Sequence, residues 1–366
     1  MDIYRTAIPM RSFEHGAATR EVAEAVVVRV AFADGQVGWG ETHPRPYVTG
    51  ETIETAARDL AETVWPACRE LDFSRAGAFG EIPLRAADGR NIQAAACAMD
   101  LAASGQARFR KLAGGPIRAR VSGVLGSSDP GRTAWRLRLM RLYGLRDFKL
   151  KLGLGEEIDA ENLRLVHGGL GKAVAAGRCT LRVDANGAWD ADSAPQRVAA
   201  LKRYGVCAVE QPVRAVAAEL AQLARRCDLP LIADESLLTA DDALALSAEP
   251  HHVWWNVRLS KNGGLFRSLE LATRAVQCGA VLVIGCMVGE SSILSAAQRM
   301  LLQLCHAPRF VEGNYGRFLL RDDLTRRSLR FGYGGRLGPL RRPELSARAD
   351  PRKIARYGTL LRTLER

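Results

Sequence analysis

The chain has 366 residues, 25% charged and 47% hydrophobic, a composition that is typical of a globular protein and excludes a disordered, collagenous or low-complexity chain. The formal net charge is +12, but basic and acidic residues are interleaved, and no basic stripe with interleaved aromatic residues occurs. This pattern argues against a nucleic-acid-binding protein and suits a small anionic substrate better.

The eight cysteines form no CxxC pair, and several lie in apolar runs, as buried free thiols usually do. The first residues lack the apolar core of a signal peptide, and the longest apolar run, around residues 280–289, is too short to span a bilayer. We therefore expect a cytoplasmic protein with reduced thiols and no membrane partner. A closed homo-oligomer is also expected.

The first hundred residues predict a small α+β domain, with bounds 1–115. Two β-rich runs within residues 22–40 flank Asp34-Gly35, and a DG pair between such runs indicates a hairpin. Helical stretches follow at about 51–71 and 91–113, where apolar residues recur at helical spacing. A hairpin followed by helices is typical of an α+β arrangement.

From about residue 117, short β runs alternate with amphipathic helical stretches. Eight strands are predicted at 118–124, 147–152, 180–184, 206–210, 230–234, 253–258, 280–286 and 309–313. Eight successive βα units favour a barrel over residues 116–320. A doubly wound open sheet is the alternative, but its GxGxxG phosphate fingerprint is missing. Residues 321–366 are expected to pack back on the first domain.

Three carboxylates end consecutive predicted strands. Asp184, Glu210 and Asp234 are separated by one βα unit each, and the carboxyl ends of barrel strands meet at one mouth, where barrel active sites lie. Mg²⁺ prefers such oxygen ligands. Each carboxylate alone is equally well explained as a helix cap or an ion-pair partner. All three together, opposite a lysine pair, favour a metal site.

Lys149 and Lys151 share one face of the second strand, because side chains alternate along a strand. Both are expected to point into the barrel mouth, where burial and like charge should lower their pKa and provide a general base. A pyridoxal-phosphate Schiff base on Lys151 is an alternative, but it would leave the three carboxylates without a purpose.

Five motifs in order resemble the enolase superfamily, and most closely its muconate-lactonizing subgroup. They are KLK at 149–151, VDANGAW at 183–189, VEQP at 209–212, ADES at 233–236 and SKNGG at 260–264. The resemblance covers essentially the whole chain. It implies a modified (β/α)7β TIM barrel with an α+β N-terminal capping domain completed by the C-terminal tail, and specificity loops near residues 11–21 and 43–51.

The resemblance also implies roles for the strand-end residues. Asp184, Glu210 and Asp234 match the residues that bind Mg²⁺ in the family, and Lys151 matches the base that removes the proton α to a substrate carboxylate. The metal stabilises the resulting enolate, because concentrated positive charge in a closed site stabilises an anion. Lys149 lies beside Lys151, where it tunes the pKa of Lys151 and touches the substrate carboxylate.

One departure concerns the sixth strand, where Arg258 stands in place of the subgroup's second catalytic lysine. Arginine is effectively never deprotonated, so Arg258 is a poor base and a good fixed cation. Lys261 is expected to face away from the mouth by strand alternation. These residues favour one-base chemistry, either cycloisomerisation or β-elimination of a small carboxylate. An epimerase or racemase of N-acylamino acids or dipeptides, and an inactive barrel that serves as a binding protein, are the alternatives.

Another departure follows the eighth strand, where Glu312-Gly313-Asn314 replaces the Asp-x-Asp of the subgroup's dipeptide epimerases, which weakens a dipeptide prediction. Glu290 is interpreted either as an acidic site residue or as a cap or ion-pair residue of the next helix. The remaining candidates for substrate or supporting contacts are Asn186, Asn256 and Glu235.

Overall fold

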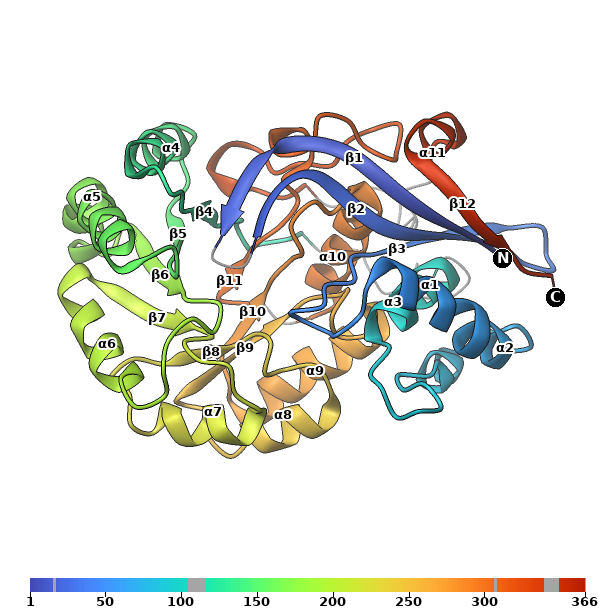
Figure 1. Ribbon diagram of the computed structural model, residues 1–366, viewed down its shortest axis with the longest axis horizontal. Coiled ribbons are helices and arrows are strands. Elements are labelled where there is room, and N and C mark those ends of the chain that lie inside the picture. The colour runs from blue at the N-terminus through green and yellow to red at the C-terminus, as the bar shows by residue number, and fades with distance from the viewer. Residues whose placement is uncertain (16–17, 105–115, 306–307, 339–348, 366) are drawn as a thin grey trace.

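The computed structural model describes residues 1–15, 18–104, 116–305, 308–338 and 349–365. An antiparallel sheet forms the N-terminal layer, with strand order β12-β1-β2-β3. Its strands are β1 (Asp2–His15), β2 (Ala18–Ala31), β3 (Val37–Thr42) and β12 (Gly358–Thr363). The chain's last strand therefore pairs with its first, and the tail completes the N-terminal sheet (Figure 1).

The predicted hairpin around Asp34-Gly35 is confirmed as the β2–β3 turn. β1 was not predicted, and the loop expected near residues 11–21 is instead largely strand, because β1 pairs with β2 over residues 2–9 and again over 13–15. The boundary between the predicted first and second domains, at residue 115, lies outside the described residues.

Helices of the first layer pack on one face of this sheet. They are α1 (Ile53–Asp59), a π-helical turn (Leu60–Val64), α2 (Trp65–Cys68), a 3₁₀ turn (Ala76–Glu81) and α3 (Gln93–Ala103). α3 approaches β3 so closely that a side chain at Gly38 or Gly40 would overlap a carbonyl oxygen of α3. Glycine is required there because only its missing Cβ permits this contact.

The barrel contains eight parallel strands in sequence order. They are β4 (Gly123–Leu125), β5 (Asp147–Lys151), β6 (Thr180–Asp184), β7 (Val206–Glu210), β8 (Leu231–Ala233), β9 (Val253–Val257), β10 (Leu282–Ile284) and β11 (Phe310–Val311). A parallel bridge from Val121 to Val311 joins the two edges and closes the sheet. The first strand was predicted to begin too early, because Arg120 pairs instead with Arg336 of the C-terminal segment.

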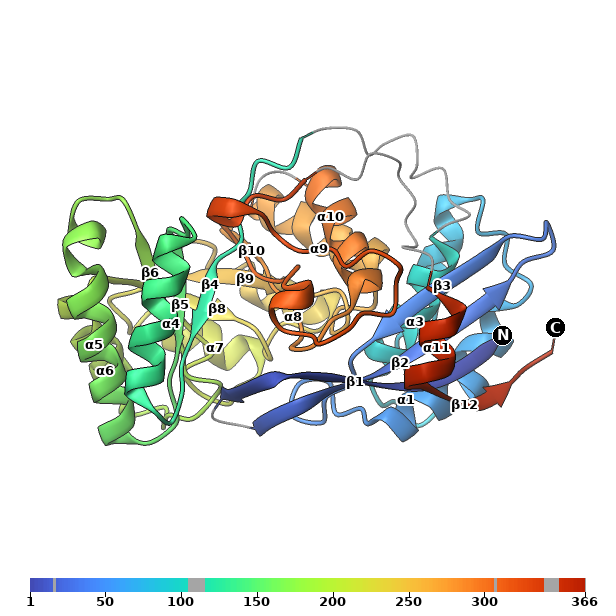
Figure 2. The same cartoon turned by 90° about the horizontal axis from the view of Figure 1, so that it is seen from above.

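Seven helices alternate with these strands, which confirms the predicted (β/α)7β order (Figure 2). They are α4 (Pro130–Leu142), α5 (Glu156–Ala175), α6 (Ala194–Leu201) with a 3₁₀ turn (Lys202–Tyr204), α7 (Ala217–Ala224), α8 (Ala240–Leu246), α9 (Leu265–Cys278) and α10 (Ser292–Leu304). After β11 come 3₁₀ turns (Gly316–Phe318, Tyr333–Gly335) and α11 (Pro351–Tyr357).

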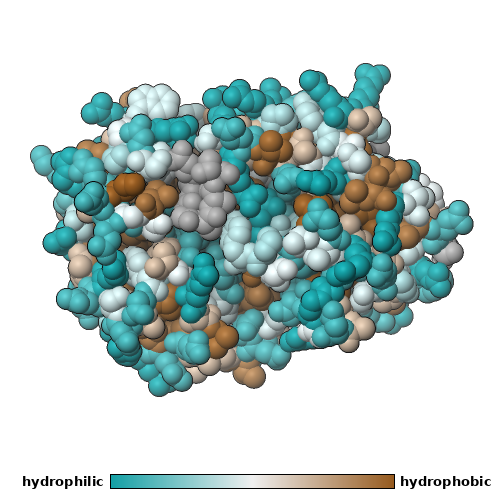
Figure 3. Space-filling model, in the orientation of Figure 1, coloured by the Kyte–Doolittle hydropathy of each residue, from teal (hydrophilic) through white to brown (hydrophobic). Residues whose placement is uncertain are grey.

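The β1–β2 hairpin extends from the first layer onto the loops that follow the last two barrel strands. Backbone bonds join Arg11 to Leu319 and Arg321 to Pro9, and a side chain at Gly289 would overlap Ala23. Among the described helices, none is long and apolar enough to cross a membrane. The face in Figure 3 is mostly hydrophilic, with hydrophobic residues in small scattered groups.

Candidate active site

The three predicted carboxylates come together at the carboxyl end of the barrel. Asp184 and Glu210 are register partners at the ends of β6 and β7, and Asp234 directly follows β8. All three side chains are completely buried. Burial and the charge of Asp184 raise the pKa of Glu210 to about 7, although Lys149 opposes this shift. Closely spaced buried carboxylates require compensating positive charge.

Lys149 and Lys151 both point into this site, on the same face of β5. Nζ of Lys149 lies 3.0 Å from Oε1 of Glu210, 3.4 Å from Oδ2 of Asp184 and 2.7 Å from Oε2 of Glu312. The expected lowering of the Lys149 pKa is wrong. Burial lowers this pKa, but the three surrounding carboxylates outweigh burial and raise it.

Lys151 has a different environment from Lys149. Its Nζ donates to Oδ2 of Asp184 over 2.6 Å and to Oδ1 of Asn186 over 2.9 Å. Its side chain keeps 10% of its surface exposed, whereas that of Lys149 keeps 2%. Of the two amines, Lys151 is therefore the one that a substrate in the barrel mouth reaches.

Arg258 closes the opposite side of the carboxylate group. Its Nη2 donates to Oε1 of Glu210 over 3.1 Å and also contacts Oδ2 of Asp234. Nδ2 of Asn256 donates to the same oxygen of Glu210 over 3.0 Å, while its Oδ1 is buried without a hydrogen-bond partner. Asn256 and Arg258 thus share the inward direction that strand alternation predicted.

Lys261 does not face away from the site as strand alternation predicted, because β9 ends at Val257 and the Lys261 ammonium reaches Asp234. Its Nζ donates to the backbone carbonyls of Asp234 and Leu237 over 2.5 and 2.8 Å, and lies 3.3 Å from Oδ1 of Asp234. The side chain is completely buried. Lys261 therefore fixes the loop that carries Asp234. Glu235 lies on this loop, with its pKa raised to about 8 by burial and the charge of Asp234.

Two residues that sequence reasoning missed support the carboxylates from within the barrel. Arg182 is completely buried, contacts Oε1 of Glu312 over 3.2 Å and donates to Oγ of Ser122 over 2.9 Å. Gln211 accepts from the backbone N–H groups of Asp234 and Ser236 with its Oε1. A charged residue two positions before Asp184, on the same strand face, is the signal that could have identified Arg182.

The backbone is strained where it positions these groups. In the described part of the chain, the non-glycine residues with positive φ are Asn186, Gln211 and Asn314, and each follows the end of a barrel strand. Non-glycine residues rarely adopt this conformation, and such strain tends to gather at functional sites. The strained turn at Asn186 lets its amide reach Lys151.

The residues that follow the eighth strand argue against a binding site for a substrate ammonium group. Glu312 is occupied by Lys149 and Arg182. Asn314 accepts from Nε of Arg299 over 2.6 Å and donates to Oε1 of Gln298 over 2.7 Å. Neither side chain therefore offers a free acceptor of the kind that an Asp-x-Asp pair would provide.

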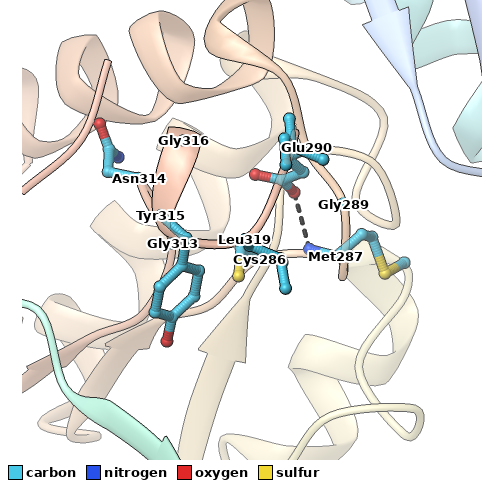
Figure 4. Close-up of a pocket in the computed structure, with 10 residues that line it drawn as sticks. Cys286, Met287, Gly289, Glu290, Gly313, Asn314, Tyr315, Gly316 and Leu319 are labelled. Atoms are coloured by element: carbon cyan, nitrogen blue, oxygen red, sulfur yellow. Dashed lines mark hydrogen bonds between the residues drawn. The ribbon is translucent and has the colours of Figure 1, made fainter. Parts of the chain in front are cut away.

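Glu290 lines a small pocket next to the site, together with Cys286, Met287 and Tyr315 (Figure 4). Its Oε1 accepts from the backbone N–H of Met287 over 2.7 Å, and burial raises its pKa to about 8. The residue that caps α10 is Ser291. Glu290 is therefore neither the predicted helix cap nor a member of the carboxylate group around Lys149.

The donor set has the chemistry of a divalent-cation site. Asp184 and Glu210 present carboxylate oxygens from neighbouring strands, and the buried carboxylate of Asp234, which contacts Arg258 and Lys261, adds two more. Within the described ranges, no three His, Cys, Asp or Glu residues are arranged around a common point for a metal ion. Lys149 and Arg258 lie between the carboxylates and supply the compensating charge.

Comparison with known proteins shows the family. The model of the family described as "Enolase C-terminal domain-like" matches residues 133–350. The chain belongs to the enolase superfamily, in its muconate-lactonizing subgroup. It is 31% identical over 340 residues to an L-Lys-D/L-Arg epimerase of Methylococcus capsulatus, covering 86% of this chain and 91% of that one.

Solved structures of the superfamily share the fold over nearly the full chain. The muconate lactonizing enzyme of Pseudomonas fluorescens, in complex with muconolactone, has a TM-score of 0.84 at 24% identity and covers 98% of both chains. The dipeptide epimerase of Enterococcus faecalis V583, in complex with Mg and the dipeptide L-Leu-L-Tyr, has a TM-score of 0.81 at 24% identity and covers 94% of this chain and 99% of that one.

Proposed function

We propose that this superfamily member abstracts the proton α to the carboxylate of a small substrate by one-base chemistry, as a cycloisomerase or a β-eliminating lyase. The single observation that carries the proposal is the placement of Lys151 and Arg258 on opposite sides of the buried carboxylates. One side offers an amine that exchanges a proton, and the other offers a guanidinium that keeps its proton.

Mg²⁺ is the metal that we propose for Asp184, Glu210 and Asp234, and a solved relative in complex with Mg supports this choice. When bound, the ion would neutralise part of the negative charge that develops on the substrate carboxylate. The observation in this chain that fits such an ion is the burial of three carboxylates at the ends of neighbouring strands.

Lys151 carries out the proton transfer. As a neutral amine, its Nζ takes the α proton, and the electron pair of the broken C–H bond moves into the carboxylate to give an enolate. Asp184 and Asn186 hold Nζ in place through hydrogen bonds of 2.6 and 2.9 Å. Lys149 and Arg258 supply fixed positive charge in a buried site, where such charge stabilises a developing anion strongly.

The second half of the reaction also uses Lys151. In β-elimination, the enolate electrons expel a group from the β carbon, and the Lys151 ammonium returns its proton to that group. In cycloisomerisation, the steps run in the opposite order. A carboxylate oxygen adds to a double bond, which gives the enolate, and the Lys151 ammonium protonates the α carbon. Each route uses one acid/base residue, which agrees with the arginine across the site.

An epimerase or racemase is the second candidate. The Methylococcus capsulatus relative has that printed activity, at 31% identity. Epimerisation requires proton delivery to the face opposite Lys151, and Arg258 stands there with Lys261 tied to backbone carbonyls. The occupied side chains of Glu312 and Asn314 also disfavour a dipeptide ammonium.

The test is α-deuterium exchange of a carboxylate library in D₂O with MgCl₂, followed by NMR. We expect exchange that retains configuration, and we expect Lys151→Ala to abolish it. Lys172→Ala, at an exposed lysine of α5, is the matched control and should exchange like the wild type. Undiminished exchange in Lys151→Ala would remove this lysine from the mechanism, and exchange with inversion would replace one-base chemistry by epimerisation.

A further inference from the structure

Arg258 is the first residue of the β9–α9 loop, which covers residues 258–264. Its backbone N–H donates to Oδ1 of Asn262 over 2.9 Å. Its backbone carbonyl accepts from the N–H groups of Lys261 and Asn262 over 3.1 and 3.0 Å. Because both backbone groups of Arg258 bond within the loop, the position of its guanidinium depends on how the loop is held.

The β9–α9 loop is also joined to the loop that carries Asp234. Nδ2 of Asn262 donates to the backbone carbonyls of Leu237 and Leu238 over 2.9 and 3.2 Å. Lys261 reaches the carbonyls of Asp234 and Leu237. Polar side chains at the middle of the β9–α9 loop therefore connect it to a second loop of the candidate active site.

Asp100 of the capping layer holds the end of the β9–α9 loop. This residue lies on α3 and is 1% exposed. Its Oδ1 accepts from the backbone N–H of Leu265 over 2.6 Å, and its Oδ2 accepts from that of Phe266 over 3.2 Å. Both N–H groups belong to the first turn of α9, where a helix favours negative charge. One carboxylate thus joins the capping layer to the barrel.

Gly264, the last residue of the loop, makes this contact possible. A Cβ at this position would lie 2.5 Å from Cβ and Cγ of Asp100, and its φ of +102° is one that other residues rarely adopt. The second glycine of the SKNGG motif is therefore required because a carboxylate from another layer of the molecule occupies the space beside it.

The capping layer also contacts this part of the barrel at two further points. The backbone N–H of His43 donates to Oγ of Ser260 over 3.1 Å. The ring of Phe266 stacks on that of Phe79, with 6.0 Å between the ring centroids. The capping layer therefore contacts the loop near Arg258 and again at the beginning of α9.

We propose that Asp100 is a positioning residue for Arg258, because it holds the β9–α9 loop against the capping layer. Asp100 supplies two hydrogen bonds from one ionisable side chain, and hydrogen bonds to ionised groups are stronger than those between neutral groups. Loss of these bonds would let the loop relax and move the guanidinium of Arg258 away from Glu210. This proposal rests on the proposed function, which assigns the stabilisation of the enolate to Arg258.

The experiment is a double-mutant cycle of Asp100→Asn and Arg258→Met. The readout is α-deuterium exchange, with MgCl₂, of a carboxylate that the wild type exchanges. Asparagine keeps the shape of the side chain but offers one oxygen in place of two. We expect Asp100→Asn to lower kcat about tenfold and to leave KM within about twofold, because a displaced charge weakens the transition state more than substrate binding. In the Arg258→Met background, Asp100→Asn should change kcat by less than about twofold, since the residue that it positions is gone.

Glu51→Gln is the matched control. Glu51 is also a buried carboxylate that accepts from two backbone N–H groups at the beginning of a helix, but that helix, α3, belongs to the same layer. Its kcat should equal that of the wild type. The proposal is overturned if Asp100→Asn keeps the wild-type kcat, if its effect multiplies with that of Arg258→Met, or if Glu51→Gln loses as much activity.

Ser260→Ala replaces Asp100→Asn in the cycle if the latter variant does not fold. It removes the hydroxyl that accepts from His43. We expect it to lower kcat about threefold in the wild type and to have no effect in the Arg258→Met background. An equal loss in both backgrounds would overturn the proposal.

Amide hydrogen exchange, measured by mass spectrometry, separates this proposal from the proposed function. Asp100→Asn should lose protection in the peptide 258–266, whether or not a substrate is found. If the wild type exchanges no carboxylate, lost protection rejects the proposed function and supports the role of Asp100 in holding the loop. Unchanged protection rejects the role of Asp100 alone.

Discussion

The guanidinium of Arg258 donates to the carboxylate of Glu210 over 3.1 Å, across the buried acidic group from Lys151. The same guanidinium contacts Asp234. Burial lowers the pKa of Arg258, but the charges of Asp234 and Glu210 outweigh burial and raise it well above its ordinary value. The residue at this position therefore determines whether the site has an acid/base group on one face of the substrate or on both.

Replacing Arg258 with lysine should add a second exchangeable amine. For a substrate with a chiral α carbon that exchanges in the wild type, we expect Arg258→Lys to give exchange with inversion, measured by NMR and chiral chromatography. Arg258→Met removes the charge without adding an amine and should lower exchange without inversion. Retained configuration in Arg258→Lys would show that geometry, rather than the arginine, sets the stereochemical outcome.

Glu312 neutralises Lys149 and Arg182 within the barrel, so its loss should be costly. We expect Glu312→Gln to lower the free energy of unfolding by roughly 3–5 kcal/mol, since removing one partner of a buried ion pair leaves an uncompensated charge. Urea denaturation followed by circular dichroism measures this. Glu157→Gln, at an exposed position of α5, should change stability little.

Adding Arg182→Met to Glu312→Gln should recover part of that loss, because it removes one of the stranded charges. A double variant that is less stable than the single Glu312→Gln variant would contradict this account of the pair.

Glu51 should make stability depend on pH. It accepts from the backbone N–H groups of Ala94 and Ala95 at the beginning of α3, and burial raises its pKa from 4.5 to about 7. The unfolded chain therefore releases this proton at lower pH than the folded chain, so stability is full below pH 4.5 and falls as pH rises to 7. The loss amounts to about 3 kcal/mol.

Glu51→Gln should flatten the corresponding part of the stability profile between pH 4.5 and 7, measured by urea denaturation at several pH values. Glu62→Gln, at an exposed carboxylate of the π-helical turn after α1, should follow the wild type. A profile for Glu51→Gln that parallels the wild type would assign the pH dependence to other groups.

Gly285 follows β10 and leaves room for Asn256, because a Cβ there would overlap Oδ1 of that residue. Gly285→Ala should displace Asn256 from Glu210 and lower deuterium exchange at least about tenfold, as expected when a supporting contact shifts by a fraction of an ångström. Full activity in Gly285→Ala would show that Asn256 does not position Glu210.

The same substitution at Gly168, on the exposed side of α5 with open space around it, should stabilise the protein by about 0.5–1 kcal/mol. Comparing the two alanine variants by thermal unfolding separates a helix-propensity effect from a packing effect.

The barrel and the position of its site residues could be predicted from the amino-acid sequence alone. The strands from residue 147 on lie within a few residues of their predicted bounds. Short apolar runs alternate with amphipathic helices there, because each βα unit must bury its strand and one face of its helix. Asp184, Glu210 and Asp234 could be placed at one mouth because carboxyl ends of parallel strands meet at the same edge. β1 was missed because Pro9 interrupts its run, and a proline within a run argues against a strand.

The balance of charges in the site depends on contacts that form only in the folded chain. The pKa of Lys149 rises instead of falling, because carboxylates from β6, β7 and β11 surround its amine. Lys261 turns to backbone carbonyls, and Arg182 enters the barrel core. Sequence patterns fix which face of an element a residue occupies, whereas electrostatic energies depend on distances between elements that are far apart along the chain.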